Sequence, residues 1–139
     1  MVVVTKKANL RTRREGEIID ITSEVEAAVR STELSNGIVT VFVQGSTGAI
    51  TTMEYEPGLL RDLPDALERI VPRGATYRHE ERWQDGNGHS HVRASLLGPG
   101  ITIPFVEGRL TLGTWQQVVF VELDVQGRSR ELILQIIGE

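Results

Sequence analysis

The sequence of 139 residues contains no cysteine, and this absence closes several classes of chemistry. Without a thiol the chain can form no disulfide framework, no thiolate nucleophile and no sulfur-ligated zinc site. Any metal must therefore be held by histidine, carboxylate, carbonyl or water ligands. A chain without cysteine also fits a reducing compartment, so we expect a cytoplasmic location.

The chain also lacks an excess of positive charge and any long apolar segment. Its 15 lysine and arginine residues are outnumbered by 19 acidic residues, which gives a formal net charge of −4. Nucleic acids and anionic membranes both require a basic surface, so neither is an expected partner. No segment approaches the roughly 20 apolar residues of a spanning helix. The apolar run Met1–Val4 is too short for a signal peptide.

Three familiar catalytic or nucleotide-binding motifs are missing as well. The chain has no P-loop, no dinucleotide-binding glycine fingerprint and no Gly-x-Ser-x-Gly elbow. The segment Gly98-Pro99-Gly100 is typical of a turn, and Gly113–Gln116 lacks the lysine of a phosphate loop. Function must therefore be sought in other residues.

The composition indicates one globular domain that covers residues 1–139. Hydrophobic residues make up 40% of the chain and charged residues 24%, as in ordinary folded proteins. Turn residues are spread evenly, and no repeat or linker is present. The pattern predicts an α+β fold of mostly antiparallel strands with two or three short helices. Strands are expected over 2–10, 17–21, 38–44, 49–54, 101–106, 114–124 and 130–137.

Turn and capping signals predict how these elements are joined. The first two strands are expected to form a hairpin, and so are the last two, which are joined through Gln126-Gly127. Ser23-x-x-Glu26 matches a capping box and predicts a helix to about residue 32. A second helix is expected from Pro57 up to residue 72, with its apolar face on Leu59, Leu60, Leu63, Leu67 and Ile70, and a third over 92–97 after the cap Asn87. Pro64 is expected to kink the second helix or divide it.

All three histidines lie between residues 79 and 91, and this clustering nominates a site. Histidine titrates near neutral pH and is a common metal ligand. On a helix, His89 and His91 would point about 200° apart, so only one can face a site. We choose His91 and expect His89 to be solvated in a loop. His79 lies in a highly charged segment, where a solvated surface residue is the alternative interpretation.

Two carboxylates are also candidates for a functional role. Glu54 ends a predicted strand, where it is either a ligand or base, or a charge exposed in a turn. Glu122 shares one face of a predicted strand with Val118 and Phe120. A carboxylate on such a face requires a cation, so we expect an ion pair with Arg128 or Arg130 in preference to a catalytic role.

Residues from about 44 to 138 resemble the YjbQ-like family, often described as secondary thiamine-phosphate synthases. The resemblance rests on His91-x3-Ser95-Leu96-Leu97-Gly98, Ile103-Pro104, Gly108-Arg109-Leu110, Leu112-Gly113-Thr114-Trp115-Gln116 and Glu122. It implies a compact mixed α/β subunit and a homotrimer. It also carries over Glu54, His79 and His91, which match acidic and histidine positions of the family's pocket. The chain departs from the family at Gly45-Ser46-Thr47, where His-Thr-Ser is usual, and at Gly127-Arg128, where a proline is missing.

The resemblance leads to three functional hypotheses. In the first, the chain is a metal-assisted transferase in which a thiazole phosphate displaces diphosphate from a hydroxymethylpyrimidine diphosphate. Glu54, His79 and His91 would then form the catalytic and metal-binding set for Mg²⁺ or Zn²⁺, and Arg109, Gln116 and Arg128 would bind the small phosphorylated substrates. In the second, favoured by Gly45 in place of histidine, a non-catalytic homotrimer holds a small anion or a metal. In the third, the same residues serve a metal-dependent hydrolase.

Overall fold

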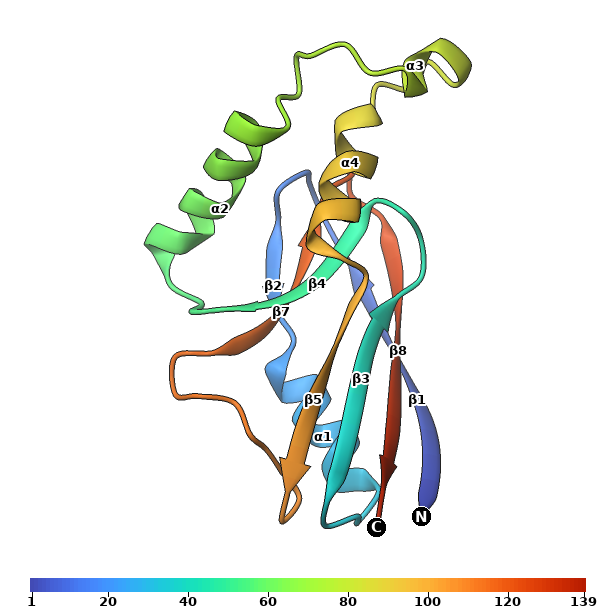
Figure 1. Ribbon diagram of the computed structural model, residues 1–139, viewed down its shortest axis with the longest axis vertical. Helices are drawn as coiled ribbons and strands as arrows, with labels where there is room; N and C mark the ends of the chain where they lie inside the picture. Colours follow the sequence, from blue (N-terminus) through green and yellow to red (C-terminus); the bar gives the residue numbers. More distant parts are fainter.

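Two antiparallel sheets and four helices make up the computed structural model, which describes all residues from 1 to 139 (Figure 1). The larger sheet has the strand order β1-β8-β3-β5-β6, and the smaller sheet has the order β2-β7-β4. The strands are β1 (Val2–Arg11), β2 (Ile18–Asp20), β3 (Gly37–Val43), β4 (Gly48–Met53), β5 (Gly100–Val106), β6 (Arg109–Leu110), β7 (Gln117–Glu122) and β8 (Ser129–Gly138). The helices are α1 (Thr22–Ser31), α2 (Pro57–Ile70), α3 (His79–Arg82) and α4 (Gly88–Leu97). The predicted α+β class is confirmed.

The larger sheet buries one face and leaves the other exposed. Along β8 every second residue is buried, which places Leu132, Leu134 and Ile136 on the inner face. β1 pairs with β8 along its whole length, so the two chain termini lie side by side (Figure 1). The helices lie on the inner side of this sheet or at its end, and none covers its outer face (Figure 1).

The smaller sheet is buried on both faces, which explains the unbroken apolar run of β7. Val118 and Phe120 pack in one cluster with the inner face of the larger sheet and with α1. Val119 and Val121 pack in a second cluster, which includes Leu67 of α2 and residues of α4. The alternation predicted for β7 is therefore correct, but neither of its faces meets solvent.

Both predicted hairpins are wrong, although the strands themselves are present. β1 pairs with β8 and β2 pairs with β7, so the turn over 12–17 carries the chain from the larger sheet to the smaller one. The turn over 123–128 carries it back, because β7 and β8 also belong to different sheets. The short strand β6, which pairs with β5, was not predicted. The apolar pattern identifies a buried face but does not select the neighbouring strand.

The predicted helices are present, with corrections to their ends. No side chain caps α1 as a capping box; the backbone N–H of Thr22 instead donates to Asp20 Oδ1 over 2.9 Å. α2 is one helix that includes Pro64, and Glu56 caps it by accepting from the backbone N–H groups of residues 58 and 59. Ile70 is 69% exposed and does not belong to the core.

The C-terminal helices differ more from the expectation. α4 begins at Gly88, four residues before the predicted start, and the single turn α3 was not predicted. Asn87 precedes α4 as expected, but its side chain forms no capping hydrogen bond. None of the four helices has the length and apolar character needed to cross a membrane.

Candidate functional site

Helices α3 and α4 bring two of the predicted site residues into contact. The ring centroids of His79 and His91 lie 4.4 Å apart, with an angle of 35° between the ring planes. Both residues are partly buried. Residues 83–87 reverse the chain between the two helices, at the end of the molecule drawn uppermost in Figure 1. The two imidazoles can therefore act on one bound group.

Two carboxylates join His79 at this end of the molecule. His79 Nδ1 lies 3.4 Å from Asp85 Oδ1 and 3.6 Å from Glu80 Oε1. The ligand atoms of the three residues all lie within 4.8 Å of one another. His79 Nδ1 is buried and has no hydrogen-bond partner, which is unusual for a polar atom in a folded protein. One imidazole nitrogen and two carboxylates form a donor set that fits a divalent cation.

Asn87 lies between two carboxylates, those of Asp124 and Asp85. Its amide nitrogen lies 3.4 Å from Asp124 Oδ1 in one orientation. With the amide turned over, the nitrogen lies 2.7 and 3.2 Å from the two Asp85 oxygens. A single amide cannot donate well to both carboxylates at once. In the turned-over orientation Asp85 accepts from Asn87, so this amide holds the carboxylate beside His79.

Glu54, the third predicted site residue, lies elsewhere in the same chain. It follows Met53, which pairs with Gln117 at the start of β7. The histidine cluster lies near the other end of β7, because Asn87 contacts Asp124 just after that strand. The six residues of β7 span roughly 20 Å between these points. Glu54 is exposed, and within one subunit it does not reach His79 or His91.

The three predicted substrate-binding residues lie in different places. Arg109 belongs to β6 and lines a hollow of about 430 Å³ together with Arg30 of α1. Gln116 accepts a hydrogen bond from the backbone N–H of Gly113 over 3.1 Å. Arg128 donates from Nε to Asp124 Oδ2 over 2.5 Å, at the end of β7 where Asn87 also lies. Of the three, Arg128 lies nearest the histidine cluster.

Glu122 forms the ion pair predicted from its apolar surroundings. Its side chain is fully buried, and both of its carboxylate oxygens bind the Arg130 guanidinium, with Nε donating to Oε1 over 2.9 Å. Thr12 donates to the same oxygen over 2.6 Å. Glu122 and Arg130 belong to different sheets, so this pair ties the two sheets together. A carboxylate with all its acceptors used is structural and is not free for catalysis.

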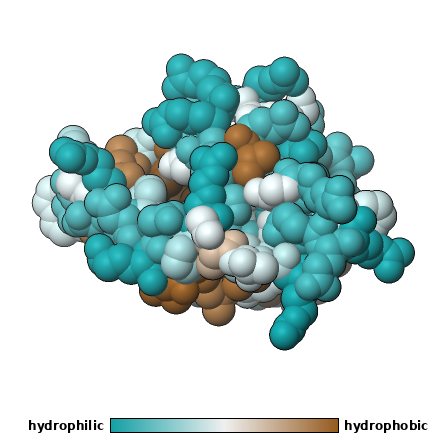
Figure 2. Space-filling model, turned by 90° about the horizontal axis from the view of Figure 1, so that it is seen from above, coloured by the Kyte–Doolittle hydropathy of each residue, from teal (hydrophilic) through white to brown (hydrophobic).

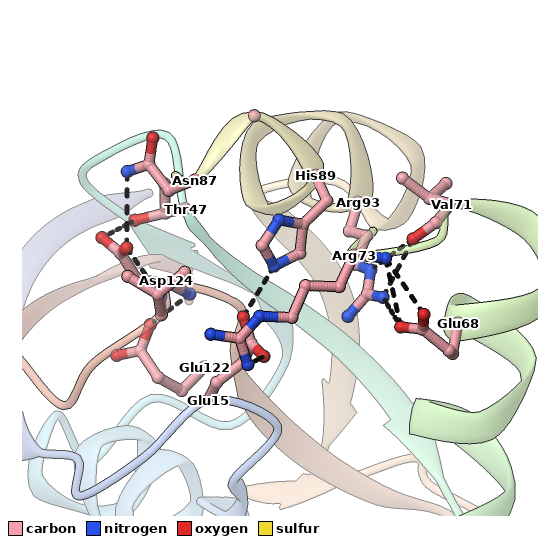
Figure 3. A network of polar contacts seen from close by, with 12 residues as sticks. Glu15, Thr47, Glu68, Val71, Arg73, Asn87, His89, Arg93, Glu122 and Asp124 are labelled. Carbon is pink, nitrogen blue, oxygen red and sulfur yellow. Dashed lines mark hydrogen bonds and ion pairs between the residues drawn. The ribbon is translucent and has the colours of Figure 1, made fainter. Parts of the chain in front are cut away.

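Asp124 continues this buried network and is also fully paired. It accepts hydrogen bonds from Thr47, Arg128 and its neighbour Val125. Burial raises the pKa of Asp124, but the Val125 N–H, followed by Arg128, Asn87 and Thr47, outweighs it and holds the pKa below its usual value. Figure 3 shows Asn87 and Thr47 directed at this carboxylate.

His89 is buried, which corrects the prediction of a solvated loop residue. It is only 1% exposed, and its Nε2 lies 2.7 Å from Glu15 Oε1 (Figure 3). The early start of α4 explains the difference, because His89 falls in the first turn of that helix and faces inward. Glu15 also binds Arg73 over 2.9 Å. His89 and His91 point in different directions, as the helical spacing predicted.

Arg93 fixes α4 to the end of α2 beside His89. Its guanidinium donates to the carbonyl oxygen of Val71 and to Glu68 Oε2, the latter over 2.7 Å (Figure 3). The backbone N–H of Arg73 is the main cause that lowers the pKa of Glu68; burial opposes it and Arg93 adds to it. These contacts hold the α4 backbone that carries His91.

The loop over 45–47 has a backbone conformation that favours glycine. Gly45 has a φ of +108°, and a Cβ atom added there would lie 3.3 Å from Arg130 Nη1. Arg130 also donates to Thr47 Oγ1 over 2.9 Å, which fixes the loop. Histidine, the usual residue of the family at this position, would be strained in this conformation.

This fold is shared by one family of proteins. The model of that family, described as UPF0047 protein YjbQ-like, matches residues 6–139. The UPF0047 protein of Methanothermobacter thermautotrophicus is 43% identical over 139 residues, which cover all of this chain and 95% of the relative. YugU of Bacillus subtilis is 31% identical and covers 96% of this chain and 98% of its own length. The chain therefore belongs to the UPF0047, YjbQ-like family.

Solved structures agree with this assignment. A YbjQ-like protein of unknown function from Sulfolobus solfataricus superposes with a TM-score of 0.94 at 35% identity, covering 99% of both chains. A hypothetical protein from Aeropyrum pernix gives a TM-score of 0.90 at 33% identity, covering 98% of this chain and 99% of its own. Their descriptions name no activity, so function must be argued from the site.

Proposed function

We propose that the chain is a metal-assisted transferase of the thiamine-phosphate synthase kind, acting in the cytoplasm. The observation that carries this proposal is the buried, unpartnered Nδ1 of His79, which faces Asp85 and Glu80 with the His91 ring beside it. These donors are suited to a divalent cation, and the cluster lies beside the partly exposed Arg128.

In this proposal each residue has a defined task. His79, Asp85 and Glu80 would hold Mg²⁺ or Zn²⁺, whose charge would offset that of the departing diphosphate. The thiazole nitrogen forms a bond to the methylene carbon of the pyrimidine as the carbon–oxygen bond to diphosphate breaks. His91 would donate a proton to that leaving group, and the Nη groups of Arg128 would bind one of its oxygens.

The proposal is tested by assaying the coupling of the two phosphorylated substrates in the presence of Mg²⁺. We expect His91→Ala and Asp85→Asn to lose thiamine-phosphate formation while circular dichroism and thermal unfolding stay close to the parent. Arg69→Ala, an exposed change on α2, is the matched control and should keep full turnover. Unchanged turnover in both site variants would overturn the assignment.

The proposal includes a homotrimer, and the exposed sheet face supports it. The outer face of the larger sheet leaves Val3, Ile38, Phe42 and Val106 between 40% and 59% exposed, a group of apolar side chains that association would cover. In a homotrimer, Glu54 of one copy would lie close to the histidines of a neighbouring copy. Light scattering measures the assembly directly. Mixed assemblies of Glu54→Ala and His79→Ala chains should regain turnover if two subunits share a site, and should stay inactive if each site lies in one chain.

A non-catalytic binding protein is the second candidate, and the conformation of Gly45 favours it. A backbone held at φ +108° beside Arg130 is poorly suited to the imidazole that the family usually carries there. In this case the cluster would bind metal without turnover. Calorimetric binding of Zn²⁺ or Mg²⁺ by a protein inactive in the coupling assay, and in phosphate release from phosphoesters, distinguishes this candidate from the transferase and from a hydrolase.

A further inference from the structure

Most charged side chains of the turn over 13–17, between β1 and β2, are paired with other groups. Glu17 accepts hydrogen bonds from the backbone N–H of Arg13 over 2.8 Å and from its guanidinium over 3.1 Å. Glu15 is directed away from the turn, to His89 and Arg73. The Arg14 guanidinium takes part in no intramolecular hydrogen bond or ion pair. The turn therefore presents one uncompensated positive charge.

Backbone contacts hold this turn in a fixed position. The N–H of Gly16 donates to the carbonyl oxygen of Glu122 over 2.8 Å, and the N–H of Glu122 donates to the carbonyl oxygen of Glu17 over 2.8 Å. Gly16 has a φ of +82°, which glycine adopts without strain. Arg14 thus projects from an ordered backbone, and only its side chain must be ordered when a ligand binds.

A cavity of about 480 Å³ lies between this turn and α2. On the side of α2 it is lined by Leu60, Arg61, Pro64 and Asp65, and Tyr55 also lines it. Arg61, like Arg14, has no acidic partner within 4.0 Å. Tyr55 is held in place because its hydroxyl donates to the carbonyl oxygen of Ile18 over 2.8 Å.

The charges around this cavity favour a small anion. Glu15 and Glu17 are already neutralised by other groups, so Asp65 is the remaining acidic side chain against two free guanidinium groups. Two like charges that line one cavity repel each other, and a bound anion relieves that repulsion. Arginine binds phosphate oxygens in pairs through its planar fork of donors. The cavity volume lies within the usual range of small-ligand sites.

We propose that this cavity binds the phosphate group of a small phosphate monoester between Arg14 and Arg61. A phosphate monoester carries close to two negative charges at neutral pH, which match the two guanidinium groups. Most of the lining is polar, so the remainder of the ligand is polar as well. The end of the molecule that is uppermost in Figure 1 is mainly hydrophilic (Figure 2). The site shares no residue with the candidate metal centre and goes beyond the transferase proposal.

The test compares glycerol 3-phosphate with glycerol at matched ionic strength, using the full chain in the presence of EDTA so that no metal contributes. We expect glycerol 3-phosphate to raise the midpoint of thermal unfolding in a saturable way and glycerol to leave it unchanged. Calorimetry should give at least a tenfold weaker affinity for R14A/R61A than for the parent. Arg69→Ala, on the same helix but outside the cavity, should bind like the parent.

Two results would overturn the proposal. One is the absence of any saturable effect of glycerol 3-phosphate on the parent protein. The other is equal binding by the parent and by R14A/R61A, which would place the anion elsewhere. Both arginines are exposed, so the unliganded variants should unfold at the temperature of the parent, and the single variants R14A and R61A allow each side chain to be checked separately. Because the assay involves neither metal nor turnover, its failure would leave the transferase proposal unaffected.

Discussion

Two polar clusters lie near the same end of β7 and differ in how completely their atoms are paired. In the first, Glu122 and Arg130 are buried and bind each other through paired contacts, with Thr12 and Thr47 completing the set. In the second, His79 Nδ1 is buried without a partner, although Asp85 and Glu80 lie within 3.6 Å. The polar atoms of the first cluster are paired, whereas the second leaves a buried ring nitrogen without a partner.

This difference separates a structural role from a chemical one. A buried charge is tolerated when its partner and hydrogen bonds are complete, and such a network then fixes the elements that carry it. A buried ring nitrogen without a partner is instead available to a ligand. Substitutions in the first cluster should therefore affect folding, and those in the second should affect binding.

The largest effect is expected from Glu122→Ala, which leaves the Arg130 charge buried without its partner. Breaking a buried ion pair in this way typically costs about 3–5 kcal/mol. Urea denaturation followed by circular dichroism measures the loss in free energy of unfolding. The double change Glu122→Leu with Arg130→Met removes both charges and should recover most of that loss. A cost below about 1 kcal/mol for Glu122→Ala would show that the two sheets do not depend on this pair.

Asp124→Asn should lower the free energy of unfolding at pH 7 by a smaller amount, about 1–3 kcal/mol, because a charged acceptor of several hydrogen bonds is removed. The pKa of Asp124 is lowered by folding, so its ionised form stabilises the protein above the ordinary carboxyl pKa of about 3.9. This contribution is lost as the pH falls through the folded-state value. Denaturation at pH 7 and pH 3 should therefore show a smaller gap between parent and variant at the lower pH. The same gap at both values would contradict the assignment, and Asp62→Asn, an exposed change, is the control.

The sequence was sufficient to predict that Glu122 forms an ion pair with Arg128 or Arg130, and the reason is local. β-strand alternation places Glu122 on the same face as Val118 and Phe120, so a cationic partner was required wherever the chain folded. Arg130 is confirmed as that partner even though the hairpin expected to deliver it does not exist. The prediction of an ion pair was therefore correct, although the strand pairing from which it was argued was wrong.

The histidine cluster was harder to predict because its geometry depends on a reversal of the chain. His79 is followed by Glu80 and Glu81, and the turn over 83–87 determines that Asp85 approaches Nδ1. The start of α4 at Gly88 determines that His89 is buried and His91 only partly buried. The sequence does not mark the start of α4 clearly, because Asn87 forms no capping hydrogen bond. An acidic residue six positions after a histidine was the signal present in the sequence.

Gly45→His tests the loop that contacts Arg130 and Asp124. We expect the free energy of unfolding to fall by about 1–3 kcal/mol, the usual cost of a side chain in a sparsely populated backbone region. The strain arises at φ +108° and from the approach to Arg130. Gly45→Ala is the matched control, because it carries the backbone strain without the imidazole, and both changes should cost similar amounts. If both variants are as stable as the parent by urea denaturation, the loop does not hold the conformation described above.

The smallest effect on stability and the largest on binding are expected together, for His79→Ala. Because Nδ1 forms no hydrogen bond and the side chain is partly exposed, its removal should change the free energy of unfolding by less than about 1 kcal/mol. Calorimetric titration with Zn²⁺ or Mg²⁺ should show at least a tenfold loss of affinity, since one of three donors is gone. His89→Ala should do the opposite, since it leaves Glu15 short of a buried partner while the metal donors remain. If both histidine variants lose stability to the same extent and bind metal equally, the unpartnered nitrogen of His79 has no role in binding, and the distinction between the two clusters fails.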